Sequence, residues 1–421
     1  MKRSTKCSRK GSALPKSTRR RENPIIPIEG GVTAATGFRA GSARAGIKAS
    51  GGADLALLSS DFDCAAAGTF TTNAIRASSV DWCENLLPSN RIRAVAVTSG
   101  CANACTGRRG ENDTATLARL TGKAFAIPAE SVLHASTGVI GRFLPMNAIA
   151  KGIASLAPAL STDGGASFAE AILTTDTRKK EVAVRVKLAG GAITIGGCAK
   201  GSGMIEPNMA TMLAFITTDA KIAPDRLHAA IRRAVDRTFN LLSVDGDTST
   251  NDMAIVLANG ASGCAVTSGD RTAFDGGLFM VCDLLCKAIA ADGEGATKRV
   301  EVAVSGAASA ADARRAAKAV ANSTLTKCAL FGNDPNWGRI ACAIGYSGAA
   351  FSREKMSIRL CGVPVFKNLQ PIGFDEIKIH RLLKGKVVAI DIDLGNGDKA
   401  ATAQTCDFSY DYVKINAEYH T

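Results

Sequence analysis

The feature that most constrains the fold of this chain is a loop containing Gly and Pro that leads directly into an apolar strand. Residues 200–219 read KGSGMIEPNMATMLAFITTD, and the apolar run that follows Thr211 predicts a strand buried in the core of an α/β protein. Thr211 therefore stands at a loop-to-strand junction. Its hydroxyl can attack the carbonyl of Ala210, convert the amide to an ester and, after hydrolysis, leave Thr211 as a new N-terminus.

The α-amine of an N-terminal threonine can act as the base for the hydroxyl of the same residue. An α-amino group has a pKa of about 7.7–8.0, whereas a lysine has about 10.4, so the amine can accept the hydroxyl proton near neutral pH. The chain has only four histidines and contains neither HExxH nor GxSxG, which disfavours a Ser/His/Asp hydrolase. From these residues alone, the alternative to a nucleophile is that Thr211 is an ordinary residue at the start of a strand.

Six motifs in order along the chain resemble one family. They are residues 136–141 (STGVIG), 200–219, 243–252 (SVDGDTSTND), 292–298 (DGEGATK), 334–339 (DPNWGR) and 414–421 (KINAEYHT). Together they resemble the glutamate N-acetyltransferase family of arginine biosynthesis, also called the ornithine acetyltransferase family. The resemblance implies a layered α/β sandwich and a precursor that cuts itself between Ala210 and Thr211. The expected parts are a disordered basic tail (1–23), an alpha chain (24–210) and a beta chain (211–421).

The resemblance also implies roles for individual residues. Thr211 would be the nucleophile, and Thr137 and Gly138 would be the oxyanion pair, although Ser-Thr-Gly taken alone is usually a turn. The residues expected to hold substrate, with Thr177 as the rival of Thr174, are Thr174, Lys200, Thr211, Glu294, Asn416 and Thr421.

The implied reaction passes an acetyl group from N-acetylornithine through an acetyl-threonine to glutamate. Acetyl-CoA is a further candidate donor, no other cofactor is expected, and the family implies two copies of each chain. An amidohydrolase or aminopeptidase that uses Thr211 but passes the acyl group to water is the alternative. An uncut scaffold whose basic arm binds nucleic acid is a third hypothesis.

The net charge of +13 is concentrated at the start of the chain. Residues 1–21 carry nine Lys and Arg and no acid, which leaves +4 for the remainder. The tail is predicted to be disordered, and nucleic acid is not an expected partner of the folded part. The tail is interpreted as an inert extension, with an organelle-targeting peptide or a polyanion-binding arm as alternatives. We expect a cytoplasmic enzyme.

Composition fits a packed α/β protein. The chain is 46% hydrophobic with 42 glycines, and it has no uncharged apolar run near the 18 residues of a membrane span. Thirteen scattered cysteines indicate reduced thiols rather than a disulfide framework, and no metal site is expected. Asp245 begins a calcium-loop-like pattern, but its sixth and twelfth positions are Thr250 and Val256, so we interpret it as a structural loop.

Periodicity predicts several elements. Strands are expected at 93–98, 181–186, 253–257, 300–304 and 387–394, and helices from Pro224 and over 278–290. The alternation of Cys406, Phe408, Tyr410 and Tyr412 predicts one more strand, which would carry the C-terminal motif to the pocket. Residues 334–339 are expected to form a turn anchored by Trp337.

Overall fold

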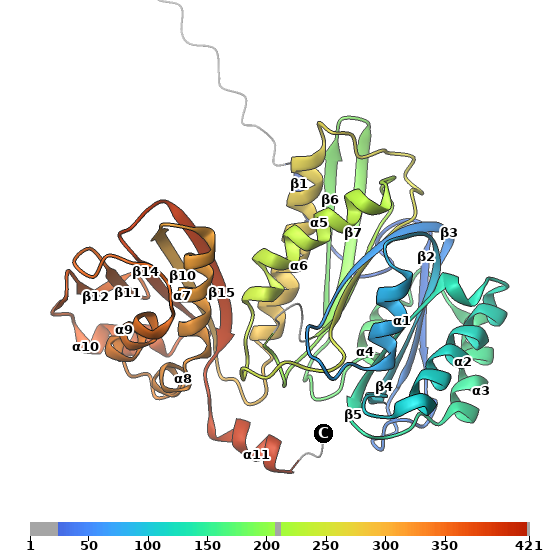
Figure 1. The fold of residues 1–421 in the computed structure, drawn as a ribbon, viewed down its shortest axis with the longest axis horizontal. Helices are drawn as coiled ribbons and strands as arrows, with labels where there is room; N and C mark the ends of the chain where they lie inside the picture. The colour runs from blue at the N-terminus through green and yellow to red at the C-terminus, as the bar shows by residue number, and fades with distance from the viewer. Residues whose placement is uncertain (1–23, 207–211, 419–421) are drawn as a thin grey trace, which may run out of the picture.

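The computed structural model describes residues 24–206 and 212–418, arranged in two sheets with helices around them (Figure 1). The larger sheet has nine strands in the order β1-β6-β7-β8-β9-β3-β4-β5, with β2 paired to β3. Its strands are β1 Ile25–Ile28, β2 Phe38–Ala43, β3 Leu55–Phe70, β4 Ser89–Cys101, β5 Val132–Val139, β6 Lys180–Leu188, β7 Gly191–Lys200, β8 Leu213–Thr218 and β9 Met253–Ala258.

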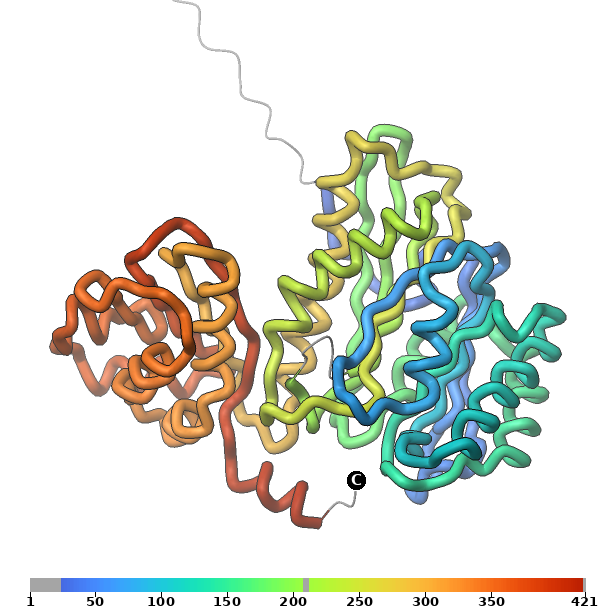
Figure 2. Tube along the Cα trace, viewed as in Figure 1, coloured from blue at the N-terminus to red at the C-terminus, as the bar shows by residue number. Residues whose placement is uncertain are grey.

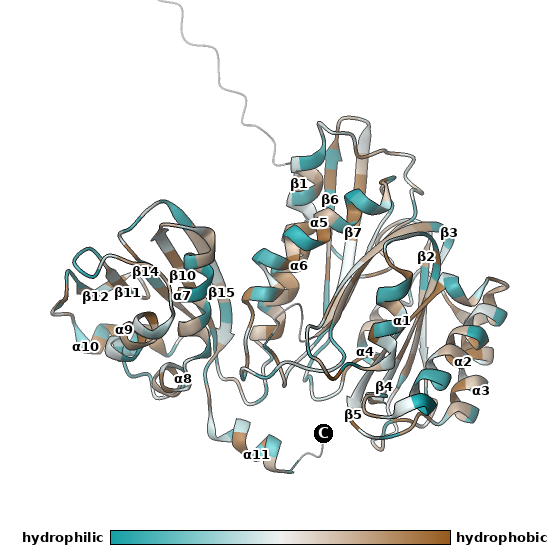
Figure 3. Ribbon diagram, in the orientation of Figure 1, coloured by the Kyte–Doolittle hydropathy of each residue, from teal (hydrophilic) through white to brown (hydrophobic). Residues whose placement is uncertain are grey.

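The central strands β8 and β9 are buried along their whole length, because both faces of the sheet are covered. Alternate side chains of a strand point to opposite faces. Ala214 and Ile216 enter one core with the helices α5 (Pro224–Arg237) and α6 (Arg271–Ala290). Leu213 and Phe215 enter another core, where Phe215 meets Phe168 of α4 (Gly165–Ala171) edge to face at 5.5 Å. In Figure 3 the labelled strands β6 and β7 of the same sheet carry brown segments.

The other helices of this unit surround the β3–β5 part of the sheet (Figure 1). Helix α1 (Ser78–Leu86) joins the core that contains Phe215, whereas α2 (Gly107–Phe125) and α3 (Met146–Leu156) cover Leu55 and Leu57. The sheet is therefore a middle layer between helices, which is the layered α/β arrangement predicted from the sequence.

A six-stranded sheet forms the smaller unit, in the order β13-β12-β11-β14-β10-β15. Its own core lies under α7 and α9, and no strand of the larger sheet joins it. Its elements are β10 Arg299–Ala307, α7 Ala310–Asn322, α8 Thr324–Phe331, α9 Trp337–Tyr346, β11 Ser357–Leu360, β12 Val363–Lys367, β13 Gln370–Pro371, α10 Glu376–Leu383, β14 Val387–Asp393 and β15 Lys399–Cys406.

The predicted strands and the helix from Pro224 are confirmed, and the helix predicted over 278–290 begins earlier, at Arg271. The strand predicted through Tyr412 is wrong. β15 ends at Cys406, and residues Tyr410–Glu418 form helix α11. Phe408 and Tyr412 are four residues apart, and their rings stack at 4.6 Å. Phe408 thus lies just before the helix and packs on a residue of its first turn.

The turn predicted at 334–339 is correct only at its start. Asn336 accepts a hydrogen bond from the Arg339 N–H at 3.4 Å and caps α9, so Trp337 is the first helical residue. The Trp337 ring stacks on Phe366 at 5.0 Å, as expected of an anchor. Arg339 donates to the Leu325 carbonyl and ties two chain segments together.

Helix α11 leaves the smaller unit and extends toward the larger one (Figure 2). The larger sheet combines strands from before residue 210 and after residue 211, so the two predicted chains are not the two structural units. In the part of the chain that the structure describes, no helix is long and apolar enough to cross a membrane, and the cysteines are free thiols.

Candidate active site

One pocket collects residues from the larger unit and from helix α11. It lies at the C-terminal ends of β5 and β7, and the loop after α6, the loop before β9 and α11 complete its wall. The lining residues are Ala102, Thr137, Gly138, Ile140, Thr174, Thr175, Lys200, Gly203, Met204, Asp245, Asp247, Ser249, Thr250, Asn251, Glu294, Tyr412 and Asn416.

Gly138 occupies a position that only glycine can fill. Its φ is +127°, and a Cβ atom there would lie 2.4 Å from the carbonyl carbon of Gly100 on the neighbouring strand. Any side chain would push β5 away from β4, because the obstructing atoms belong to the backbone. The absence of a side chain thus lets Thr137 and Gly138 line the pocket beside the end of β4.

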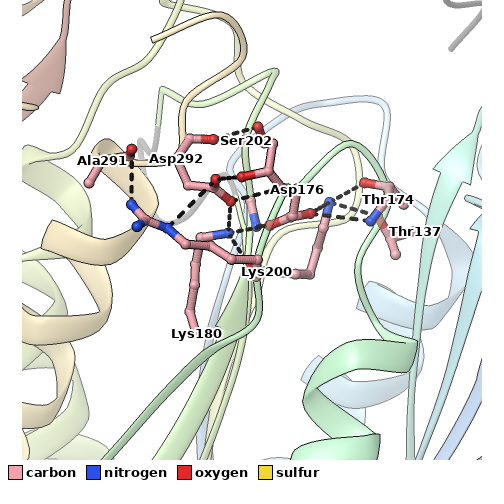
Figure 4. A network of polar contacts seen from close by, with 11 residues as sticks. Thr137, Thr174, Asp176, Lys180, Lys200, Ser202, Ala291 and Asp292 are labelled. Carbon is pink, nitrogen blue, oxygen red and sulfur yellow. Dashed lines mark hydrogen bonds and ion pairs between the residues drawn. The ribbon is translucent and has the colours of Figure 1, made fainter. Parts of the chain in front are cut away.

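Lys200 links two threonine hydroxyls (Figure 4). Its Nζ lies 2.8 Å from Thr174 Oγ1 and 3.4 Å from Thr137 Oγ1, and the residue is only 8% exposed. An ammonium group can only donate, so both hydroxyls accept from Lys200 and keep their own hydrogens for another acceptor. The geometry therefore provides a positive charge and polarised O–H donors, which suit an anionic ligand or a developing oxyanion.

A buried ionic cluster stands behind Lys200. Lys180 Nζ lies 2.6 Å from Asp176 and 2.6 Å from Asp292, and none of these side chains is more than 3% exposed. Burial alone would raise the pKa of Asp176, but Lys200, Lys180 and the Gly201 N–H together lower it to about 2. Burial lowers the pKa of Lys200, and Asp176, 3.9 Å away, partly offsets that effect.

Glu294 is also fixed in the pocket wall. Its backbone N–H donates to the Ser202 carbonyl at 3.0 Å, and its carboxylate accepts from the Asn416 amide of α11 at 2.9 Å. A Cβ on Gly203 would lie 2.3 Å from the Glu294 carboxylate, so glycine makes room for that group. The pocket thus presents an ammonium group and, facing the same space, a carboxylate that can bind an amine.

The structure brings the predicted residues Thr137, Gly138, Thr174, Lys200, Glu294 and Asn416 together around this pocket. Thr174 lines the pocket, whereas its rival Thr177 hydrogen-bonds Asp292 behind it. Ala210, Thr211 and Thr421 lie outside the described residues. The described chain resumes at Met212, and Leu213 pairs with Lys200 in the ladder of β7 and β8.

The sequence analysis missed Asp176 and Lys180, and it quoted Asp292 only as part of a motif. Their i,i+4 charge spacing was visible in the sequence, but such a pair normally marks a solvated surface. Lys180 is instead the first residue of the interior strand β6, with a side chain 1% exposed. Only the tertiary contact with Asp292 distinguishes the two cases.

Histidine chemistry and metal binding have no visible basis in the described segments. None of the histidines in residues 24–206 and 212–418 lines the pocket. His134 lies inside the protein, where burial lowers its pKa to about 3 and keeps it neutral. Within the same residues, no group of three His, Cys, Asp or Glu side chains is arranged to hold a metal ion.

The fold and the pocket define a layered α/β protein whose binding site holds lysine, threonine and glutamate side chains. Residues 39–421 match the model of the ArgJ family. The chain is 49% identical over 399 residues to "Arginine biosynthesis bifunctional protein ArgJ" of Symbiobacterium thermophilum, covering 94% of this chain and 99% of the relative. It is 45% identical over 413 residues to the chloroplastic protein of that name from Oryza sativa subsp. indica, covering 95% and 89%. The chain therefore belongs to the ArgJ family.

A crystal structure of the arginine biosynthesis bifunctional protein from Bacillus halodurans contains a similar chain. It is 44% identical, and the match covers 50% of this chain and 100% of that chain with a TM-score of 0.49.

Proposed function

We propose that this protein is an acetyltransferase of arginine biosynthesis that moves the acetyl group of N2-acetyl-L-ornithine to L-glutamate. The observation that carries the proposal is the Lys200 ammonium, which donates to Thr137 and Thr174 in a pocket that Glu294 and Asn416 also line. The relatives named as arginine biosynthesis bifunctional proteins support the same assignment.

In the first half-reaction, the Thr211 hydroxyl attacks the acetyl carbonyl carbon and its proton passes to the Thr211 α-amine. The new C–O bond places negative charge on the former carbonyl oxygen. The Thr137 hydroxyl and the Gly138 N–H donate to this oxyanion, and Lys200 strengthens the Thr137 donor. The C–N bond then breaks, and ornithine leaves with the proton held by the α-amine.

In the second half-reaction, the amine of glutamate attacks the acetyl-Thr211 ester. The C–O bond to Thr211 breaks, a proton returns to the hydroxyl, and N-acetylglutamate leaves. Donor and acceptor both carry an α-carboxylate next to an α-nitrogen, so one pocket with Lys200 and Glu294 can serve both. The amidohydrolase alternative differs only in that water takes the acyl group, and exclusion of water decides between them.

The nucleophile arises by self-cleavage between Ala210 and Thr211. The alpha chain (24–210) and the beta chain (211–421) then stay associated, because β7 and β8 pair across the cut from Ile195 to Lys200. Two copies of each chain form the assembly. Thr211 itself carries the acetyl group, so no cofactor is needed, and acetyl-CoA serves as a second donor. The enzyme works in the cytoplasm, and residues 1–21 are dispensable for activity.

Two measurements test the function. Denaturing electrophoresis should show two products near half of the 43.4 kDa precursor, and Thr211→Ala should leave one uncut chain. Thr211→Ser should keep part of the cleavage, because a hydroxyl remains. Product analysis should find N-acetylglutamate when glutamate is present. Acetate as the main product with and without glutamate would support the amidohydrolase instead, and a full-length chain that transfers acetyl groups would contradict the N-terminal amine mechanism.

A further inference from the structure

The loop between η3 (Phe239–Leu241) and β9 contributes to the pocket wall, but the proposed reaction uses none of its residues. This loop is the motif SVDGDTSTND at 243–252. It belongs to the predicted beta chain, yet it packs against the alpha chain, where Thr71 donates to the Ser249 carbonyl and Asn73 to the Thr248 carbonyl. The loop therefore connects the two halves of the chain at the pocket.

Asn251 contacts the residue that precedes Thr137. Its side chain is buried, and its Nδ2 donates to the Ala102 carbonyl at 2.6 Å and to the Ser136 carbonyl at 2.8 Å. Both partners are acceptors only, so the amide can have only this orientation. Thr250 Oγ1 donates to Asn251 Oδ1 at 2.6 Å and satisfies the other end of the amide.

The carbonyls of Ser136 and Val139 lie on either side of the residues expected to hold the oxyanion, and both accept hydrogen bonds in this network. Ser136 immediately precedes Thr137, and the Ala102 N–H donates to the Val139 carbonyl at 2.9 Å. The Asn251 side chain and the Ala102 backbone thus link the Ser136 carbonyl to the Val139 carbonyl through hydrogen bonds. Thr137 and Gly138 are the residues enclosed between the two anchored carbonyls.

The regular pairing of β4 and β5 is interrupted beside Thr137 and Gly138. The parallel ladder of β4 and β5 loses its register between Gly100 and Cys101, where Gly138 has its positive φ. The Asn251 side chain supplies donors to two carbonyls at this irregularity. Fixing the Ser136 carbonyl fixes the plane of the Ser136–Thr137 peptide, which contains the Thr137 N–H and Cα.

We propose that Asn251 is a positioning residue of the oxyanion site, and that it holds Thr137 and Gly138 in the geometry that acetyl transfer requires. This inference rests on the proposed function. It assigns the 243–252 motif a task beyond lining the pocket. The chain that begins with Thr211 would thereby align the oxyanion donors of the other chain.

Asn259 offers a matched control. Asn259 directly follows the last residue of β9, and Asn251 lies shortly before its first residue. Both are buried, since Asn259 is 8% exposed and Asn251 is 5% exposed. Its Nδ2 also reaches into the alpha chain, to the Thr36 carbonyl at 2.9 Å and Ser60 Oγ at 3.4 Å. Asn259 does not line the pocket. The two residues therefore make the same kind of contact, and only one of them lies at the site.

The test compares Asn251→Ala, the isosteric Asn251→Asp and Asn259→Ala in the full-length protein. Self-cleavage is followed by intact mass, and kcat and KM for acetylornithine are measured on the cleaved enzyme. Both Asn251 variants should cleave and fold but lose roughly 10- to 100-fold in kcat with KM nearly unchanged, because small misplacements of catalytic groups cost about this much. Asn259→Ala should keep its kcat within about threefold even where its stability falls.

Each other outcome is decisive. A wild-type protein without acetyl transfer would refute the proposed function. With an active wild type, a normal kcat in Asn251→Ala would overturn only the role of Asn251. An equal loss of kcat in Asn259→Ala, or a rise in KM alone, would show a general contact between the halves. Asn251 variants that stay uncut, or that fail to fold while Asn259→Ala folds, would also overturn the proposal.

Discussion

Replacing Lys180 by Met should destabilise the protein strongly, although the substitution changes little volume. The Lys180 ammonium is the shared partner of Asp176 and Asp292, with both N–O distances at 2.6 Å and almost no exposure to water. Met fills the space of the aliphatic stem but removes the charge. Two buried carboxylates would then remain, with Lys200 at 3.9 Å from Asp176 and the half-exposed Arg178 at 3.8 Å from Asp292.

The magnitude follows from burial. The pKa of Asp176 falls from 3.8 to about 2, which corresponds to about 2 kcal/mol of stabilisation of its charged form. Removing one partner of a buried ion pair typically costs about 3–5 kcal/mol, because an uncompensated charge stays inside. We expect Lys180→Met to lie in that range. Adding Asp292→Asn to Lys180→Met should recover part of the loss, since one of the two unpaired carboxylates is then gone.

The adjacent lysine provides the control. Lys179 pairs with Glu181 at 3.1 Å, but its side chain is 47% exposed, so Lys179→Met should change the free energy of unfolding by less than about 1 kcal/mol. Urea unfolding should be measured in the Thr211→Ala background, which keeps one continuous chain, and at the same protein concentration for every variant. A loss below about 1 kcal/mol for Lys180→Met, or no recovery in the double variant, would refute the claim that charge burial governs this site.

Three further predictions concern the same pocket. Thr137→Ala should lower kcat roughly 10²- to 10³-fold with little change in KM, as loss of one oxyanion donor does, and a large KM rise at normal kcat would contradict this role. Gly141→Ala meets no atom within 4 Å and should cost about 1–2 kcal/mol of positive-φ strain in urea unfolding, whereas Gly138→Ala should cost more and also abolish turnover. The low pKa of Asp176 stabilises the fold above its unfolded pKa of about 3.8, so the advantage of wild type over Asp176→Asn should shrink between about pH 4 and pH 2 in unfolding titrations.

Local patterns predicted the elements whose burial is continuous or regularly alternating. The apolar run after Thr211 forms β8, because a continuous apolar run fits a strand buried on both faces. The alternation at 387–394 forms β14, because alternation fits a strand buried on one face. The C-terminal motif shows where local patterns fail. Tyr410 and Val413 are 84% and 68% exposed, so no buried stripe marks α11 as a helix. The alternation of Cys406, Phe408, Tyr410 and Tyr412 does not continue the strand, because β15 ends at Cys406 and a helix begins at Tyr410.

By itself, the sequence determined the layered α/β class and the set of residues that could carry the proposed chemistry, because both depend on local patterns and motifs. The tertiary structure alone decided which charges are buried together and which backbone groups are held in place. Lys180 and Lys179 are neighbours in the chain, yet one is buried between two carboxylates and the other faces water. Asn251 and Asn259 are both buried, but only Asn251 lies at the pocket. Burial and long-range partners set the energy of a polar group, and chain neighbours do not specify them.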